Sequence, residues 1–201
     1  MRIAIILFFV LLTSFGCQEK KRSIKGDTLY QRQQNADFKD ASKSPLKPKD
    51  LKNFEGLDFF KPDSTYVVKA FLERSKDTVW FKMKTTTDRV SEERVFGVLS
   101  FELKGQTYQL NIYQGKDLIT EDGFEGYLFL PFLDETNGVE TYGGGRYIDA
   151  KIPKGDSLII DFNKAYNPYC AYNEAYSCPV VPRENYLKTR VEAGVKAFKK
   201  H

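Results

Sequence analysis

The strongest constraint on the fold comes from residues 65–163, where short apolar segments follow one another too closely for helices to lie between them. Segments rich in β-branched and aromatic residues span residues 65–74, 78–88, 94–114, 126–134 and 156–163. Alternation of apolar and polar positions, as in 78–88, is typical of strands with one buried face. Parallel strands need long crossover connections, which are missing here. We therefore predict a mainly β fold, either an antiparallel β-sandwich or a partly open barrel.

Two further patterns bear on this architecture. Lys104-Gly105-Gln106 separates two alternating runs and predicts a hairpin, because a short link containing glycine favours a tight turn. Residues 29–41 hold good helix formers without Gly or Pro and predict an N-terminal helix packed on the sheet. Residues 186–200 are ambiguous, because their apolar spacing fits a helix while Gly194 disfavours one.

The N-terminus has the pattern of a secretory leader. Residues 1–16, MRIAIILFFVLLTSFG, place one arginine, a short apolar run and small residues before Cys17. The apolar run is shorter than the roughly 20 residues of a bilayer-spanning helix. LTSFGC resembles the lipobox of bacterial lipoproteins, in which the cysteine becomes the acylated N-terminus. We expect a lipoprotein signal peptide over 1–16, lipidated Cys17 with a polar tether over 17–28, and one domain over 29–201.

Lipidation would place the protein at the cell envelope, with the membrane as its partner through palmitate-like chains, and each buried methylene adds about 0.8 kcal/mol. In Gram-negative lipoproteins an Asp after the cysteine often retains the protein at the inner membrane, so Gln18 favours the outer membrane. An ordinary leader with a chance cysteine, or an uncleaved anchor, is the alternative. The net charge is only +4 and no basic run interleaves with aromatics, so we expect no nucleic-acid partner.

The cysteine count suggests a disulfide. Three cysteines are present, and lipidation of Cys17 leaves Cys170 and Cys178 as an even pair in an oxidising compartment. We predict a disulfide between them, with free thiols or a redox pair as the alternatives. The only histidine is His201 at the chain end, so no Cys/His zinc set can be assembled, and we expect neither a metal nor a cofactor.

Three motifs of the C-terminal half resemble the DUF1684 family of bacterial and archaeal proteins. They are TYGGGRYID (141–149), DFNKAYNPYCAYN (161–173) and SCPVVPREN (177–185). The similarity extends back to about Ser44, and it implies one domain of this length but no activity, because the family has none assigned. Near the end the chain departs from the family pattern, with Val195 where an acid is usual.

The glycine run 143–145 allows a close backbone approach, and Arg146 after it can present its guanidinium to a carboxylate or a phosphate. The simpler alternative is a sharp turn in which Arg146 pairs with a structural acid such as Asp161. Asp161 and Asn163 alternate with Phe162 at a strand end, so both would face a cleft or solvent if Phe162 faces the core.

Residues 161–185 gather Tyr, Asn and Pro, which predicts a long loop fixed by side-chain hydrogen bonds. We hypothesise that this loop forms one wall of a pocket that also contains Tyr169 and Tyr172, although a loop that is merely stiff is the alternative. The candidate ligand-binding residues are Arg146, Asp161, Asn163, Tyr166 and Asn167.

Two functions fit these patterns. The first is a membrane-anchored β domain that binds a small ligand or an envelope protein. The second is an envelope hydrolase that uses carboxylates among Asp134, Glu140 and Asp161, with Arg146 as an anion clamp. Ser–His and Cys–His nucleophile schemes are disfavoured because the only histidine is terminal, and no catalytic residue is assigned.

Overall fold

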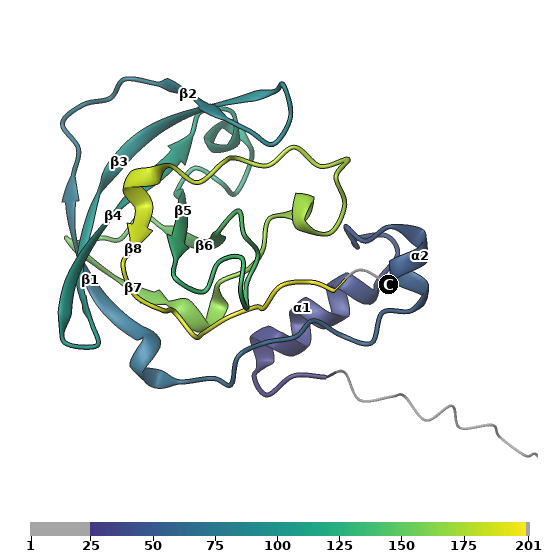
Figure 1. Cartoon of the computed structure of the whole chain (residues 1–201). Helices are drawn as coiled ribbons and strands as arrows, with labels where there is room; N and C mark the ends of the chain where they lie inside the picture. Colours follow the sequence, from purple (N-terminus) through teal and green to yellow (C-terminus); the bar gives the residue numbers. More distant parts are fainter. Residues whose placement is uncertain (1–24, 200–201) are drawn as a thin grey trace, which may run out of the picture.

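A computed structural model describes residues 25–199, and its centre is an eight-stranded sheet that curls into a nearly closed barrel (Figure 1). The strands are β1 (Val67–Arg74), β2 (Phe81–Lys84), β3 (Val90–Leu103), β4 (Gln106–Gly115), β5 (Tyr127–Asp134), β6 (Arg146–Lys151), β7 (Ser157–Asp161) and β8 (Tyr186–Leu187). They pair in the order β6-β5-β4-β3-β1-β7, with β2 beside β3 and β8 beside β5. Every pairing except β5–β8 is antiparallel, so the predicted barrel is confirmed.

β3 and β4 form the predicted hairpin. Leu103 pairs with Gln106, and Lys104 and Gly105 between them have φ angles of 52° and 75°. Two positive φ angles suit the type I′ turn that matches the twist of the flanking strands. The register shifts near Gly97, where a Cβ atom would lie only 2.5 Å from the carbonyl oxygen of Glu73, so a side chain does not fit there.

The period-two pattern sends alternate side chains into the barrel. Along β1, Val68, Ala70 and Leu72 are buried while their neighbours are exposed. β5 is buried on both faces, because Leu128 lies in the barrel core and Phe129 packs in a second cluster outside it. The nearly continuous apolar sequence of β5 therefore reflects two cores on either side of one strand.

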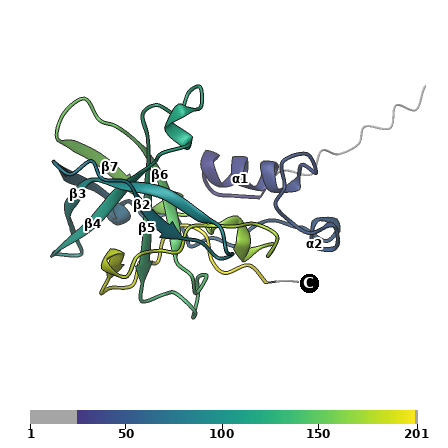
Figure 2. The ribbon, with the colours of Figure 1, turned by 90° about the horizontal axis from the view of Figure 1, so that it is seen from above.

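Two helices lie at one side of the barrel (Figure 2): α1 (Leu29–Lys39) and α2 (Pro48–Lys52). Thr28 starts α1 with a capping box to Gln31. Phe38 near the end of α1 packs edge-on against Tyr172, with ring centroids 4.8 Å apart. The predicted N-terminal helix is thus present, and it is docked on the predicted loop rather than on the sheet itself.

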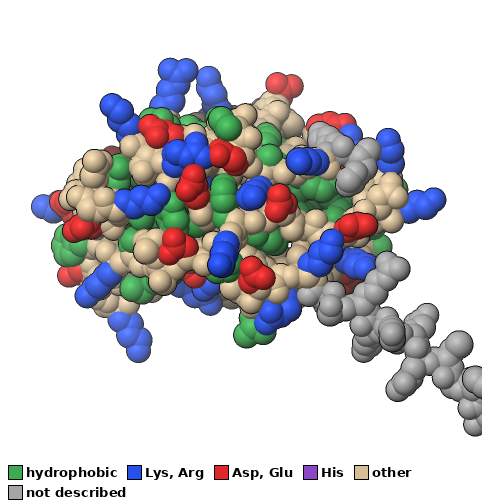
Figure 3. All heavy atoms as spheres, turned by 60° about the horizontal axis from the view of Figure 1, so that its bottom comes forward, with side chains coloured by type: hydrophobic (Ala, Val, Ile, Leu, Met, Phe, Trp, Pro, Cys, Tyr) green, Lys and Arg blue, Asp and Glu red, His purple; other side chains and the backbone are tan. Residues whose placement is uncertain are grey.

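The outer surface carries both signs of charge. Lys and Arg side chains lie among Asp and Glu side chains on the face shown in Figure 3. This distribution matches the near balance of 31 basic and 27 acidic residues in the chain.

The C-terminal segment, ambiguous in sequence, contains no helix within the described residues up to 199. It runs extended along the barrel, and the Val195 amide donates to the carbonyl of Ala165 at 2.9 Å. Gly194 adopts φ 78°, and a Cβ there would lie 2.6 Å from the same carbonyl. The glycine is required because the segment passes close to another backbone, a tertiary constraint that overrides the helical spacing.

A buried ion pair fastens this segment to the barrel. Arg146, the first residue of β6, is fully buried, and its Nη2 donates to Asp134 Oδ2 and to the carbonyl of Val191, both at 2.8 Å. Nη1 donates to the carbonyls of Ala193 and Val195. Asp134 Oδ1 in turn accepts from the Val191 amide at 3.2 Å. One guanidinium thereby satisfies backbone groups that have no strand partner.

We expect Arg146→Ala to destabilise the protein by about 3–5 kcal/mol, because Asp134 would stay buried without its counter-charge. Urea denaturation measures the change. Arg190→Ala is the matched control, since its ion pairs with Glu140 and Glu192 are half-exposed and contribute about 1 kcal/mol or less. An unfolding midpoint for Arg146→Ala equal to that of the wild type would contradict the structural role.

Candidate functional site

A cavity of about 620 Å³ opens beside the barrel, between the outer face of β5 and β6 and the loop that covers them. Clefts of roughly 300–1,000 Å³ are typical of small-molecule sites. Alternation along the strands explains its lining, because Leu128 and Ile148 point into the barrel core while their neighbours point outward. Its floor and walls include Tyr30, Glu93, Phe129, Tyr147, Asp149 and Tyr166.

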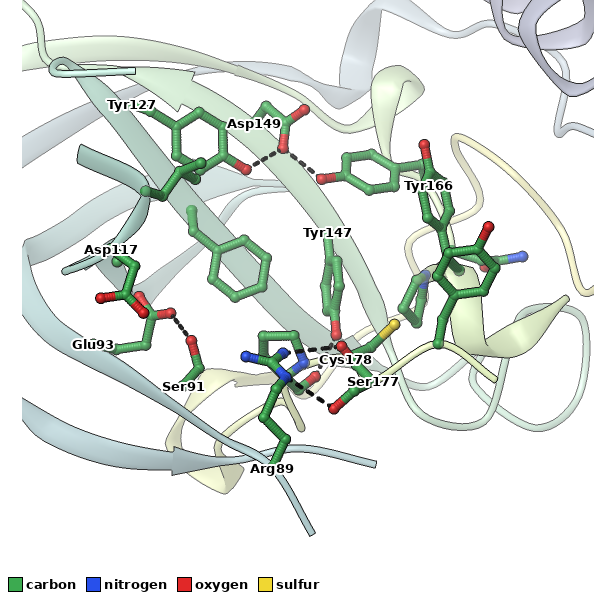
Figure 4. A pocket seen from close by; sticks show the side chains of 18 of the residues that line it. Arg89, Ser91, Glu93, Asp117, Tyr127, Tyr147, Asp149, Tyr166, Ser177 and Cys178 are labelled. Atoms are coloured by element: carbon green, nitrogen blue, oxygen red, sulfur yellow. Dashed lines mark hydrogen bonds between the residues drawn. The ribbon is translucent and has the colours of Figure 1, made fainter. Parts of the chain in front are cut away.

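Aromatic rings form the floor of the cavity (Figure 4). Tyr147 meets Phe129 edge-on with ring centroids 4.7 Å apart, and it meets Tyr166 edge-on at 5.9 Å. The hydroxyl of Tyr147 donates to the carbonyl of Pro179. Tyr147 and Tyr166 also exchange both backbone hydrogen bonds, at 2.9 and 3.0 Å. The floor is therefore fixed by side-chain and backbone contacts together.

Asp149 is held by two phenols. The hydroxyls of Tyr127 and Tyr166 both donate to Asp149 Oδ1, at 2.7 and 2.5 Å. Burial raises the pKa of both tyrosines above the ordinary value of 10.0, so both remain donors at neutral pH. Among the described residues no group donates to Oδ2, and this oxygen stays available as an acceptor.

Glu93 on β3 is the buried acid of the cavity, with only 5% of its surface exposed. Ser91 donates to its Oε1 at 2.6 Å, while Oε2 has no hydrogen-bond partner among residues 25–199. Burial raises the pKa of Glu93. Its cross-strand partner is Gly115, where a Cβ would lie 3.3 Å from both carboxylate oxygens. The missing side chain lets the carboxylate pack directly over the backbone of Gly115.

Acidic groups outnumber basic ones around the cavity. Five carboxylates and two cations contribute to its lining: Glu92, Glu93, Asp117, Glu121 and Asp149 against Arg89 and Lys116. Lys116 pairs with Glu92 at 2.9 Å. Arg89 donates to the hydroxyl and the carbonyl oxygen of Ser177, at 3.1 and 3.0 Å, and so holds the loop against the strands. Both cations are therefore already engaged in the structure.

The two remaining cysteines are neighbours. Both are thiols in the structure, Cys178 lines the cavity, and the Cys170 amide donates to Cys178 Sγ at 3.2 Å. The hydrogen bond from the Cys178 thiol lowers the pKa of Cys170 to about 6, and the same bond together with burial raises the pKa of Cys178. A thiolate beside a thiol favours oxidation. The disulfide between them stays a prediction.

The loop over residues 161–185 is fixed as predicted, by short 3₁₀ turns and by hydrogen bonds to both sides. Tyr166 and Asn167 line the cavity, as does Tyr169. Tyr172 is buried against α1 instead. Asn167 also donates to the carbonyl of Lys196 at 2.9 Å, which joins the cavity wall to the C-terminal segment.

The other candidate residues lie elsewhere. Arg146 does not reach the cavity, and its acidic partner is Asp134 rather than Asp161. Asp161 accepts from the amide of Asn163 at 3.1 Å, and Asn163 exchanges hydrogen bonds with the backbone of Asp63, at 2.9 and 2.8 Å. These side chains tie a strand end to the preceding segment, so they hold the fold and do not line this cavity.

The glycine run makes its close approach to the protein itself. Gly145 has φ 89°, and a Cβ there would lie 2.7 Å from the carbonyl oxygen of Phe132. The run is therefore the sharp turn that sequence analysis offered as the simpler alternative.

The proposed hydrolase set does not converge. Asp134 is used by Arg146, Glu140 pairs with Arg190 near the surface, and Asp161 caps a turn. No group of three or more His, Cys, Asp and Glu side chains within residues 25–199 is arranged to hold a metal ion.

Sequence analysis missed Glu93, Tyr127, Tyr147 and Asp149. Glu93 stands in SEER, which resembles an exposed charged stretch, but in the structure it is buried and lies across from Gly115. Tyr147 and Asp149 lie within TYGGGRYID, where only the glycines and Arg146 were considered as site residues. Both alternate with Ile148, and this alternation indicates that they share one face of a strand.

Fold and site together define a small antiparallel β-barrel protein with an aromatic, acidic cavity on its side. No helix in residues 25–199 is long and apolar enough to cross a bilayer. The chain belongs to the DUF1684 family, whose sequence model, described as "Protein of unknown function (DUF1684)", matches residues 52–196.

The chain is also similar to a solved structure of this size. This is the solution NMR structure of an uncharacterized protein from Haloarcula marismortui, with 34% identity and a TM-score of 0.63. The match covers 79% of this chain and 85% of that one. No curated protein matches the sequence.

The Glu93 carboxyl gives a pH-dependent prediction. Its pKa is raised in the folded state above the ordinary value of 4.5, so ionisation penalises folding as the pH rises through the raised pKa. We expect Glu93→Gln to increase the free energy of unfolding by about 1 kcal/mol at pH 8, with the gain vanishing near pH 4.

Urea denaturation at several pH values tests this expectation. Glu102→Gln removes the same charge from an exposed position of β3 and should show no such trend. A gain for Glu93→Gln that is independent of pH, or a loss of stability at pH 8, would contradict the assignment.

Proposed function

We propose that the protein is a non-catalytic ligand-binding domain, held at the cell envelope by a lipidated Cys17, and that a small molecule occupies the cavity. The observation that carries the proposal is the cavity of about 620 Å³ with an aromatic floor and unpaired acceptor atoms. Its walls are fixed by hydrogen bonds, and a preformed site binds with less loss of conformational entropy.

Binding fits the groups around the cavity better than catalysis does. The tyrosines have raised pKa values, so they donate hydrogen bonds and do not act as nucleophiles. Burial and the hydrogen bond with Cys170 raise the pKa of Cys178, the cysteine that faces the cavity, and so keep it protonated. Cys170, whose pKa is lowered, lies toward the hydroxyl of Tyr142 instead. Neither the tyrosines nor Cys178 therefore offers an activated nucleophile to a substrate in the cavity.

The lipid anchor rests on the sequence alone, because Cys17 lies outside the residues that the structure describes. The tether from Cys17 to Thr28 spans at most roughly 40 Å when extended. It leads to α1, whose Tyr30 and Phe38 line the cavity. An anchored chain would therefore hold the cavity close to the membrane surface, which supports a ligand that is present in the envelope.

A thermal-shift screen of small molecules on the full chain tests the binding proposal. A ligand at 100 times its Kd stabilises by about 2.7 kcal/mol, which corresponds to a rise in Tm of roughly 5–10 °C. We expect Asp149→Asn to reduce this rise, and Asp156→Asn, an exposed change outside the cavity, to preserve it. Equal protection of Asp149→Asn and the wild type by every hit would exclude this cavity as the site.

The anchor has its own test. We expect Cys17→Ser to move the protein from the membrane fraction to the soluble fraction and to abolish labelling by a palmitate analogue, because the acylated sulfur is gone. Cys178→Ser, which leaves Cys17 intact, should remain in the membrane fraction. Tight membrane attachment of Cys17→Ser would refute the lipid anchor.

A further inference from the structure

We infer that the cavity selects an organic cation, an ammonium or guanidinium group carried on a compact apolar body, with Glu93 as its charge partner. This inference rests on the proposed function, since it names the chemical class of the ligand that the cavity would bind. The contacts of Glu93, the aromatic floor and the balance of charges each support it.

Glu93 has no ion-pair partner among the described residues, and the positive charge of Arg89, which acts to lower its pKa, does not offset the burial that raises it. Its buried Oε2 accepts no hydrogen bond from these residues. A buried carboxylate without a partner is unfavourable, so folded proteins normally pair it with Arg or Lys. The neighbouring cations do not form an ion pair with Glu93, because Arg89 donates its hydrogen bonds to Ser177 and Lys116 pairs with Glu92. The position of the missing cation is thus left to a ligand.

Gly115 sets where the carboxylate lies. It is directly across from Glu93 on β4, and any side chain there would begin 3.3 Å from both carboxylate oxygens. The acid therefore packs directly over the glycine backbone. A residue with a Cβ would press on the carboxylate and shift it from its place in the cavity wall.

The aromatic floor suits the remainder of such a ligand. Figure 4 shows Glu93 and Asp117 on one side of the cavity, Asp149 on another, and the ring of Tyr147 on the side nearer Tyr166 and Cys178. Tyrosine faces attract cations by about 0.5–2 kcal/mol and also bury apolar surface. The free Oδ2 of Asp149 offers a second acceptor for a donor on the ligand.

The charge balance disfavours an anionic ligand. Five carboxylates in the lining would repel it, and the two cations would have to give up existing hydrogen bonds or ion pairs to receive it. A neutral ligand would leave the Glu93 charge buried and unpaired. A cation alone turns this unfavourable group into a binding interaction.

The test compares three probes with one phenyl ring and different charges: phenethylamine, 3-phenylpropionate and 3-phenylpropan-1-ol. Each is titrated into the full chain, with affinity measured by calorimetry and position by the NMR shifts of the cavity residues. We expect phenethylamine to bind at least about tenfold more tightly than the other two, a difference worth about 1.4 kcal/mol. Glu93→Gln should remove most of this preference, and Glu102→Gln should keep it.

Gly115→Ala provides a second variant, which keeps the charge of Glu93 but places a methyl group against its oxygens. It should also weaken phenethylamine binding, whereas the alcohol should lose less affinity. A loss of affinity for phenethylamine in both variants, without a similar loss for the alcohol, supports the inference.

Different negative results contradict the cation inference and the proposed function. Tighter binding of the alcohol or the carboxylate in the cavity, or an unchanged cation preference in Glu93→Gln, would overturn the cation inference and leave the binding domain standing. Absence of shifts at the cavity residues with phenethylamine at about 10 mM would also overturn it. If the broader screen too yields no molecule that perturbs these residues, the proposed function falls as well.

Discussion

The ion pair between Arg146 and Asp134 supports more than its own neighbourhood. It holds the extended C-terminal segment, whose Val195 amide in turn fixes the carbonyl of Ala165. The next residue, Tyr166, pairs with the backbone of β6 and places its ring and hydroxyl in the cavity. A contact in the interior therefore determines the position of a group that faces the cavity. Such dependence is expected when a site is built on a loop, because loops are positioned by the scaffold that they cross.

The two buried carboxylates, Asp134 and Glu93, differ in how well their oxygens are satisfied. Both oxygens of Asp134 accept hydrogen bonds, although Nε of its partner Arg146 is buried without an acceptor among the described residues. Around Glu93 one carboxylate oxygen has no partner, and the facing position is a glycine. Folded proteins commonly concentrate such unsatisfied groups where they bind or react, and they accept lower stability there.

The sequence predicted the fold well because strand alternation and the Lys104-Gly105 turn are local patterns that the tertiary structure reinforces. It predicted a loop held by side-chain hydrogen bonds, and Tyr166 and Asn167 of that loop line the cavity, while their role in binding stays a prediction. It offered a structural ion pair for Arg146 but named Asp161 in place of Asp134, and it did not find Glu93, since both depend on partners distant in sequence. An arginine after glycines has the same pattern whether it meets a ligand or a buried aspartate. The charged residues around Glu93 in the sequence give no indication that its neighbour on the adjacent strand is a glycine.

The position of α1 has a consequence for how such proteins diversify. The helix contributes Tyr30 and Phe38 to the cavity, yet it precedes the part of the chain that matches the family, residues 52–196. It is attached through Phe38, which packs in a small cluster with Phe54 and Tyr172, and through the Tyr30 hydroxyl, which donates to the carbonyl of Lys164 at 2.8 Å. Substitutions in this helix can reshape one wall while the barrel and its ion pair stay intact. The leading helix thus forms a separate wall of the cavity whose side chains can change while the scaffold stays the same.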